Sequence, residues 1–291
     1  MWPLIEIAVE PEAAADRPRL DAALAQVAAA DAAVSVATDR ESGLALLCAS
    51  DEPSLTRALD RLVTDHGLAL RVGEPLVAYR ETITRAVDVR ARFQGARVRL
   101  RFEPGPPRSG LVFVAQAPAV LADWASAVAA GVEGATAVGI LAGFPAIDIR
   151  ATLVDGAFSG VLPEGISPGS ASVVTAFTMA AVQAFRHLRD EGAPVLMEPV
   201  MRLDLDVPEA AATAVLDDLA GHRGRMSTRA RGGGRAVVTA LVPLVELFGY
   251  DDRLRRLTAG MGEGSMAFDH YAPLPQPAPD GAFPPAVGLR A

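Results

Sequence analysis

The chain has no lysine among its 291 residues, so all 27 of its permanently cationic side chains are arginines. Without lysine there can be no phosphate-binding P-loop, no Schiff base and no lysine general base. A single cysteine, Cys48, excludes an internal disulfide. The longest uncharged stretch, residues 166–185, is interrupted by Ser, Thr, Gln, Gly and Pro, which argues against a membrane span. The first residues lack a basic segment and a long apolar run, so we expect no signal peptide and a cytoplasmic protein.

The composition is that of a globular protein, with 51% hydrophobic and 21% charged residues. The length suits two or three modules rather than one core. A net charge of −8 argues against a protein that coats nucleic acid. It leaves room for a local basic face, because binding responds to how charge is distributed.

Hydrophobic periodicity predicts an α+β protein in which the first and third modules share the element order βαββαβ. In the first module, residues 1–73, strands are expected at 4–10, 34–38, 44–49 and 68–72, and helices at 18–30 and 53–66. In the third, residues 195–275, strands are expected at 201–207, 225–229, 236–243 and 266–271, and helices at 208–220 and 251–259.

The second module, residues 74–194, is expected to open with one long strand at 78–93. Further strands are expected at 97–103, 111–115 and 144–154, a loop at 155–170, and helices at 120–132 and 171–189. The proline-rich end of the chain, residues 276–291, is predicted to be a flexible tail.

The hairpin at residues 86–102 carries two alternating patterns. Apolar side chains alternate with charged ones on both strands, so five arginines should share one face of the hairpin: Arg90, Arg92, Arg97, Arg99 and Arg101. Like charges this close repel one another, and guanidinium groups suit phosphates, so RNA or another polyanion could occupy this face. The alternative is a solvated outer face with Asp88 and Glu103 as partial counterions.

A second basic strip surrounds the turn of the third module's hairpin and contains Arg223, Arg225, Arg229, Arg231 and Arg235. Its glycines, residues 232–234, could let the backbone approach a phosphate. The alternative is a flexible turn whose arginines serve solubility.

No catalytic site is visible in the sequence. The four histidines are scattered without metal-ligand spacing, and Cys48 lies in an apolar strand, where a buried inert thiol is expected. Asp148 and Asp155 could pair in space, but no nucleophile and base stand together. We therefore expect no enzyme activity, no metal and no cofactor.

Several separate motifs in the third module carry a resemblance. They are Met197-Glu198-Pro199-Val200-Met201, His222-Arg223-Gly224-Arg225-Met226, Leu244-Val245-Glu246-Leu247-Phe248-Gly249-Tyr250 and Met266-Ala267-Phe268-Asp269-His270-Tyr271. Looser matches are Val77-Ala78-Tyr79-Arg80-Glu81-Thr82-Ile83, Ala142-Gly143-Phe144-Pro145 and Leu153-Val154-Asp155-Gly156. Over about residues 4–275 the chain resembles domains III–V of elongation factor G, a translational GTPase.

The resemblance implies two ferredoxin-like sandwiches flanking a module like domain 2 of ribosomal protein S5 (S5 domain 2-like). In the family, these domains reach into the ribosomal decoding site and help to move transfer RNA. This chain departs from the family at the tips of its fourth domain. A tight turn with Gln94 and Gly95 replaces a long glycine-rich loop, and Ser159 stands where the second loop carries a histidine. With no P-loop, we expect the GTPase domain to be absent.

Two functions remain open at this point. The resemblance implies a GTPase-less relative that binds the ribosome or its RNA near the factor site, with or without a separate GTPase subunit. The altered tips and acidic net charge favour the alternative, in which the scaffold serves off the ribosome as a protein-interaction or small-ligand module.

Overall fold

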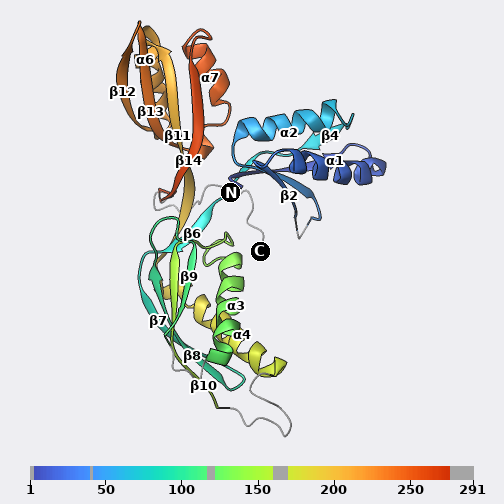
Figure 1. Cartoon of the computed structure of the whole chain (residues 1–291), viewed down its shortest axis with the longest axis vertical. Helices are drawn as coiled ribbons and strands as arrows, with labels where there is room; N and C mark the ends of the chain where they lie inside the picture. The colour runs from blue at the N-terminus through green and yellow to red at the C-terminus, as the bar shows by residue number, and fades with distance from the viewer. Residues whose placement is uncertain (1–2, 40–41, 117–121, 160–169, 276–291) are drawn as a thin grey trace. The chain divides into compact units, whose positions relative to one another are not determined.

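A computed structural model describes residues 3–39, 42–116, 122–159 and 170–275 (Figure 1). It confirms an α+β protein, with helices packed against mainly antiparallel sheets. The chain divides into two compact units, one formed by residues 1–78 with 198–272 and the other by 79–197 with 273–291. The module boundaries at residues 73, 194 and 275 stay a prediction, and the predicted tail lies outside the described residues. Within the described ranges, no helix has the length and hydrophobicity that crossing a bilayer requires.

The first sheet has the strand order β2-β3-β1-β4, with the short β5 added beside β1. Its elements are β1 (Ile5–Pro11), α1 (Arg17–Ala30), β2 (Val34–Thr38), β3 (Ala45–Ala49), α2 (Glu52–Thr64), β4 (Leu70–Val72) and β5 (Leu76–Val77). The central strand β3 is buried along its whole length, because its five residues are small or apolar. The predicted βαββαβ order is present, and the strand order is consistent with a ferredoxin-like sandwich.

The start of α2 shows how local sequence sets an element boundary. The Asp51 carboxylate accepts a hydrogen bond from the Ser54 amide at 2.8 Å, and Pro53 occupies the first turn. Leu55, Ala58 and Leu62 then follow at helical spacing and are buried. The cap and the apolar stripe together orient the helix onto the sheet.

A second sheet has the corresponding order, β12-β13-β11-β14. Its elements are β11 (Pro194–Pro208), α6 (Glu209–Gly221), β12 (Arg225–Gly232), β13 (Arg235–Pro243), α7 (Tyr250–Leu257) and β14 (Glu263–Pro273). The first and third predicted modules therefore repeat one topology. The strands are longer than expected.

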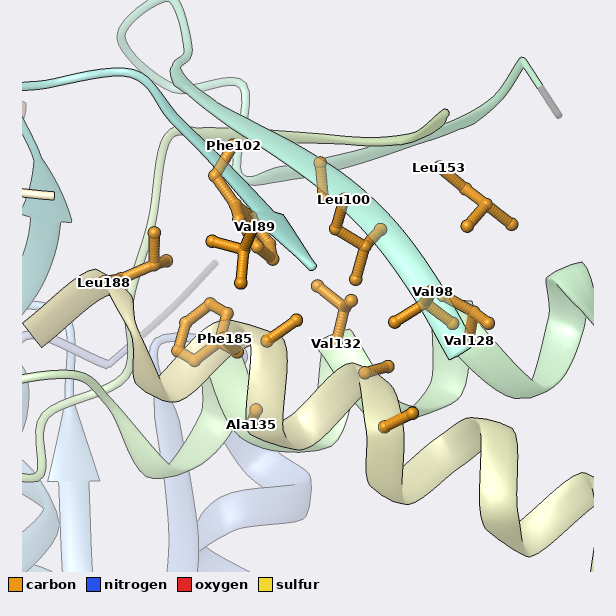
Figure 2. Close-up of a cluster of buried hydrophobic side chains, with 14 of the residues drawn as sticks. Val89, Val98, Leu100, Phe102, Val128, Val132, Ala135, Leu153, Phe185 and Leu188 are labelled. Atoms are coloured by element: carbon orange, nitrogen blue, oxygen red, sulfur yellow. The ribbon is translucent and has the colours of Figure 1, made fainter. Parts of the chain in front are cut away.

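The middle part of the chain forms a four-stranded sheet with the order β7-β8-β10-β9, in which β9 and β10 are parallel. Its strands are β7 (Val87–Phe93), β8 (Ala96–Pro104), β9 (Leu111–Ala115) and β10 (Ile149–Phe158), and its helices are α3 (Ala122–Val138), α4 (Ala171–Arg186) and the short α5 (Leu188–Glu191). Both long helices cover the same face of this sheet (Figure 1). Side chains of the hairpin, β10 and the helices meet there in one buried core, as Figure 2 shows for Leu100, Val132 and Phe185.

The expectation of one strand at residues 78–93 is wrong. The chain forms β6 (Arg80–Ile83), which pairs with β11, then bends and starts β7. The bend arises because the Thr84 and Arg85 amides both donate to the Gly192 carbonyl at 3.1 Å, which ends the ladder with β11. Residues 84–86 contain no proline or glycine, so the sequence carries no turn signal at the bend.

Two other predicted boundaries of the second module are also wrong. The strand expected at 144–154 begins only at Ile149, because the preceding backbone turns through Asp148, whose φ is 55°. It continues to Phe158, four residues into the expected loop, and residues 160–169 lie outside the described part of the chain.

A buried carboxylate explains the shortened strand. Glu81 is fully buried and accepts hydrogen bonds from the amides of Leu141 and Ala142 at 2.7 Å, from Phe144 at 3.0 Å, and from Ile140. A buried charge is tolerated where several amides converge on it. This cluster joins two sequence motifs, residues 77–83 and 142–145, that are about sixty positions apart.

The contact between α3 and α4 gives a stability prediction. A Cβ at Gly131 would clash with the Thr178 carbonyl oxygen and lie 2.9 Å from the Ala181 Cβ, whereas a Cβ at Gly134, on the same helix, would meet nothing within 4 Å. We expect Gly131→Ala to lower the free energy of unfolding by about 1–3 kcal/mol through overpacking. Gly134→Ala should raise it by up to about 1 kcal/mol, because alanine favours the helix. Urea denaturation of both variants tests this, and equal shifts would contradict the close approach of these two helices.

Candidate polyanion-binding face

The β7–β8 hairpin separates apolar and charged side chains onto opposite faces. Its register pairs Asp88 with Arg101, Val89 with Leu100, Arg90 with Arg99, and Arg92 with Arg97. The apolar side chains are buried beneath α3 and α4, so the arginines point away from the helices. Four of the five predicted arginines are exposed and Arg99 is half-buried. We call this the arginine face: Arg90, Arg92, Arg97, Arg99 and Arg101.

Two of these arginines are engaged by acidic neighbours. Arg99 donates two hydrogen bonds to the Asp88 carboxylate, each at 2.8 Å, and Arg101 lies 3.1 Å from Glu103. The hydrogen bond from Arg99 holds the pKa of Asp88 below its usual range. The two acids act as the counterions that the sequence suggested.

The other three arginines are open. Among the described residues, Arg90, Arg92 and Arg97 form no ion pair and no side-chain hydrogen bond. Arg92 and Arg97 are directly opposite each other next to the turn, and Arg90 is two residues away. We name these three the open arginines. Their charges repel one another, and within the described residues none of the three is held in an ion pair.

The open arginines surround a hollow of about 450 Å³. Its lining also includes Arg99 and, from β10, Asp155, Gly156 and Ala157. The hollow thus has four guanidinium groups and one carboxylate. Planar guanidinium forks of this kind bind phosphate oxygens in pairs.

The two short tip segments meet at one end of this face. Gln94 and Gly95 both have positive φ, 43° and 89°, and form the tight turn between β7 and β8. The Ser159 amide donates to the Gly95 carbonyl at 2.9 Å, and the Ser159 hydroxyl reaches the same oxygen at 3.3 Å. The residues predicted as a tip are therefore adjacent to one another and next to Arg92 and Arg97.

The second predicted basic strip is largely neutralised. Arg223 donates to the buried carboxylate of Glu198 at 2.6 and 2.9 Å and to Glu246 at 2.9 Å. Arg231 and Arg235 both pair with Asp206. Arg225 and Arg229, on the edge strand β12, are exposed and form no ion pair within the part of the chain that the structure describes.

The partners Glu198 and Asp206 were not anticipated from the sequence. Asp206 of β11 is paired with Val237 of β13, and Val237 is in turn paired with Arg229 of β12. Glu198 lies within one of the motifs that carry the resemblance, which was the available signal. Glu198 and Arg223 are 25 residues apart along the chain, and no local sequence pattern reveals a contact between residues so far apart.

Asp148 and Asp155 lie in different surroundings. The Asp148 carboxylate accepts hydrogen bonds from the backbone amides of Arg108 at 3.1 Å and Gly110 at 3.0 Å. These bonds fix the turn before β9. Asp155 lies seven residues further along the chain, on the hollow, so the two aspartates do not pair. In the described ranges, no three acidic, histidine or cysteine side chains are grouped as metal ligands would be.

Comparisons with known proteins agree with this architecture. Family models match along the chain, described as elongation factor G domain III at residues 2–74, domain IV at 75–189 and the elongation factor G C-terminus at 195–281. Elongation factor G of Hyphomonas neptunium is 39% identical over 284 residues, which cover 94% of this chain and 39% of that protein. A crystal structure of a Thermus thermophilus protein superimposes with a TM-score of 0.73 at 31% identity, over 94% of this chain and 41% of the other. The chain thus spans about two-fifths of the length of the relatives it matches.

Single substitutions can distinguish the arginines of the second strip that stabilise the fold from those that do not. Removing Arg223 leaves the carboxylate of Glu198, only 3% exposed, without its guanidinium partner. We expect Arg223→Ala to lower the free energy of unfolding by about 1–3 kcal/mol. Arg225→Ala, the matched control two residues away, should change it by less than about 0.5 kcal/mol. Chemical denaturation measures both, and a stable Arg223→Ala variant would show that this pair is not structural.

Proposed function

Because this chain belongs to the elongation factor G family, we propose that it acts in translation by binding the ribosome through its RNA, near the site that such factors use. The open arginines of the β7–β8 hairpin make the central contact. The observation that carries the proposal is local: three guanidinium groups that form no ion pair with the described residues surround one hollow, in a chain whose net charge is −8. Arg99 and Arg101 border the contact while paired with their acids, and Gln94, Gly95 and Ser159 form its tip.

The electrostatics favour a phosphate-rich partner. An acidic chain is repelled by RNA at long range, so binding requires a face where positive charge is concentrated. Acids on the same face neutralise Arg99 and Arg101, but leave Arg90, Arg92 and Arg97 available. Each phosphate that an arginine neutralises releases counterions from the RNA and so adds to the salt dependence of binding.

The third module contributes less under this proposal. Of its predicted basic strip, Arg225 and Arg229 lie outside any ion pair in the described structure, whereas Arg223, Arg231 and Arg235 are held by acids. We assign the paired residues to stability, and Arg225 to a peripheral contact.

These 291 residues supply binding rather than catalysis in our proposal. The printed sequence has no lysine and hence no P-loop, so GTP hydrolysis coupled to this binding would come from another part of the protein or another subunit. The competing proposal is an off-ribosome partner, for which the departures at the tip are the motivation.

Charge removal on the open arginines tests the proposal. We expect the triple variant Arg90→Ala, Arg92→Ala, Arg97→Ala to lower ribosome affinity by at least about tenfold at low salt. The slope of log affinity against log salt should become shallower by about 2. The measurement is co-sedimentation through sucrose at several salt concentrations, with elongation factor G as competitor.

A second triple variant controls for net charge. Arg57→Ala, Arg61→Ala and Arg71→Ala remove the same charge from α2 and β4, where Arg57 and Arg71 are exposed and Arg61 is half-buried. This variant should bind ribosomes like the unmodified protein. Equal losses in both triples would reduce the effect to net charge, and undetectable binding of the unmodified protein would favour the off-ribosome alternative.

A further inference from the structure

One acidic residue, Asp155, lies inside the otherwise basic hollow. It belongs to the motif Leu153-Val154-Asp155-Gly156, and the proposed function gives its carboxylate no role. Its side chain is exposed, and the hollow's lining otherwise carries four arginines. A carboxylate at this position repels every phosphate that the arginines attract. An exposed acid at this position has three kinds of partner available: water, a group of the protein, or a hydrogen-bond donor of the ligand.

The backbone turns Asp155 toward the hollow by means of a β-bulge. Leu153 is opposite Leu100, and both are buried under the helices. The next paired residue is Asp155, opposite Arg99, so Val154 is the extra residue. Without this insertion, alternation would direct Asp155 into the core.

Pairing within the protein does not account for Asp155. Arg99 is its cross-strand neighbour, but both hydrogen bonds from that guanidinium group go to Asp88. Within the described ranges, Asp155 takes part in no salt bridge and no side-chain hydrogen bond. It influences Arg99 through space alone. Its oxygens are therefore available to donors on a bound molecule.

Two rows of side chains show how a ligand would lie. One row across β7, β8 and β10 runs Arg90, Arg99, Asp155, and the next runs Arg92, Arg97, Ala157. Adjacent strands are about 4.8 Å apart and two residues along a strand span about 6.8 Å, so Asp155 and the open arginines are separated by roughly 8–12 Å at the backbone. That separation matches a phosphate on the arginines and the sugar of the same nucleotide beside Asp155.

We propose that Asp155 accepts a hydrogen bond from a ribose 2′-hydroxyl and so makes the hollow selective for RNA over DNA. This inference rests on the proposed RNA contact and adds to it the class of nucleic acid. The 2′-hydroxyl is the donor that RNA has and DNA lacks. In RNA it offsets the repulsion from the carboxylate, whereas in DNA that repulsion remains uncompensated.

Fluorescence anisotropy with two labelled 12-nucleotide single strands of one sequence, RNA and DNA, tests the inference on the full chain. The unmodified protein should bind RNA about tenfold more tightly, the effect of one hydrogen bond to a charged group. Asp155→Ala should bring the two affinities within about twofold, mainly by strengthening DNA binding. Asp155→Asn, which loses the charge but keeps an acceptor oxygen, should strengthen binding of both strands and retain part of the preference.

Asp60→Ala serves as the matched control, because it removes one exposed acidic charge from α2, which belongs to the other compact unit. It should leave the RNA preference unchanged. Equal binding of RNA and DNA by the unmodified protein, or an undiminished preference in Asp155→Ala, would overturn the role of Asp155 while leaving the arginine contact standing. Binding of neither strand would instead contradict the proposed RNA contact itself, and the inference with it.

Discussion

The packing of the β7–β8 hairpin against α3 and α4 is the constraint on which the candidate site depends. Leu100 and Phe102 are fully buried against Val132 and Phe185, and each is followed or preceded by an arginine. Since side chains alternate along a strand, burying one set fixes the other on the opposite face. The arginine face is therefore held in place by the core beneath it, and not by contacts among the arginines.

Ion pairing separates the arginines of this face into two groups, those held by acids and those available to a ligand. Acids placed by the same alternation, Asp88 and Glu103, occupy Arg99 and Arg101. In the third module the same chemistry serves stability, since Glu198 and Asp206 occupy Arg223, Arg231 and Arg235. An arginine cluster in the sequence is thus no measure of an available basic surface. What distinguishes the hairpin is that its acids are too few for its arginines.

The sequence predicted the features that follow from local rules. Alternation predicted the arginine face, and helical periodicity predicted α2 within about two residues of its observed ends. The sequence-based predictions were wrong where contacts between residues far apart in the chain determine the ends of an element. The bend after Ile83 depends on the Gly192 carbonyl, and the late start of β10 depends on the turn at Asp148. The bulge that exposes Asp155 has no signal in the pattern, because it is defined by the register with β8.

Arginine-selective labelling would test the account most directly. Treating the protein with phenylglyoxal in the presence and absence of ribosomes, followed by mass spectrometry, reports the accessibility of each arginine separately. The account predicts that ribosomes protect Arg90, Arg92 and Arg97 while leaving Arg57, Arg61 and Arg71 reactive. Unchanged labelling of the three open arginines in a complex that demonstrably forms would contradict it, and would mean that another surface of the chain makes the contact.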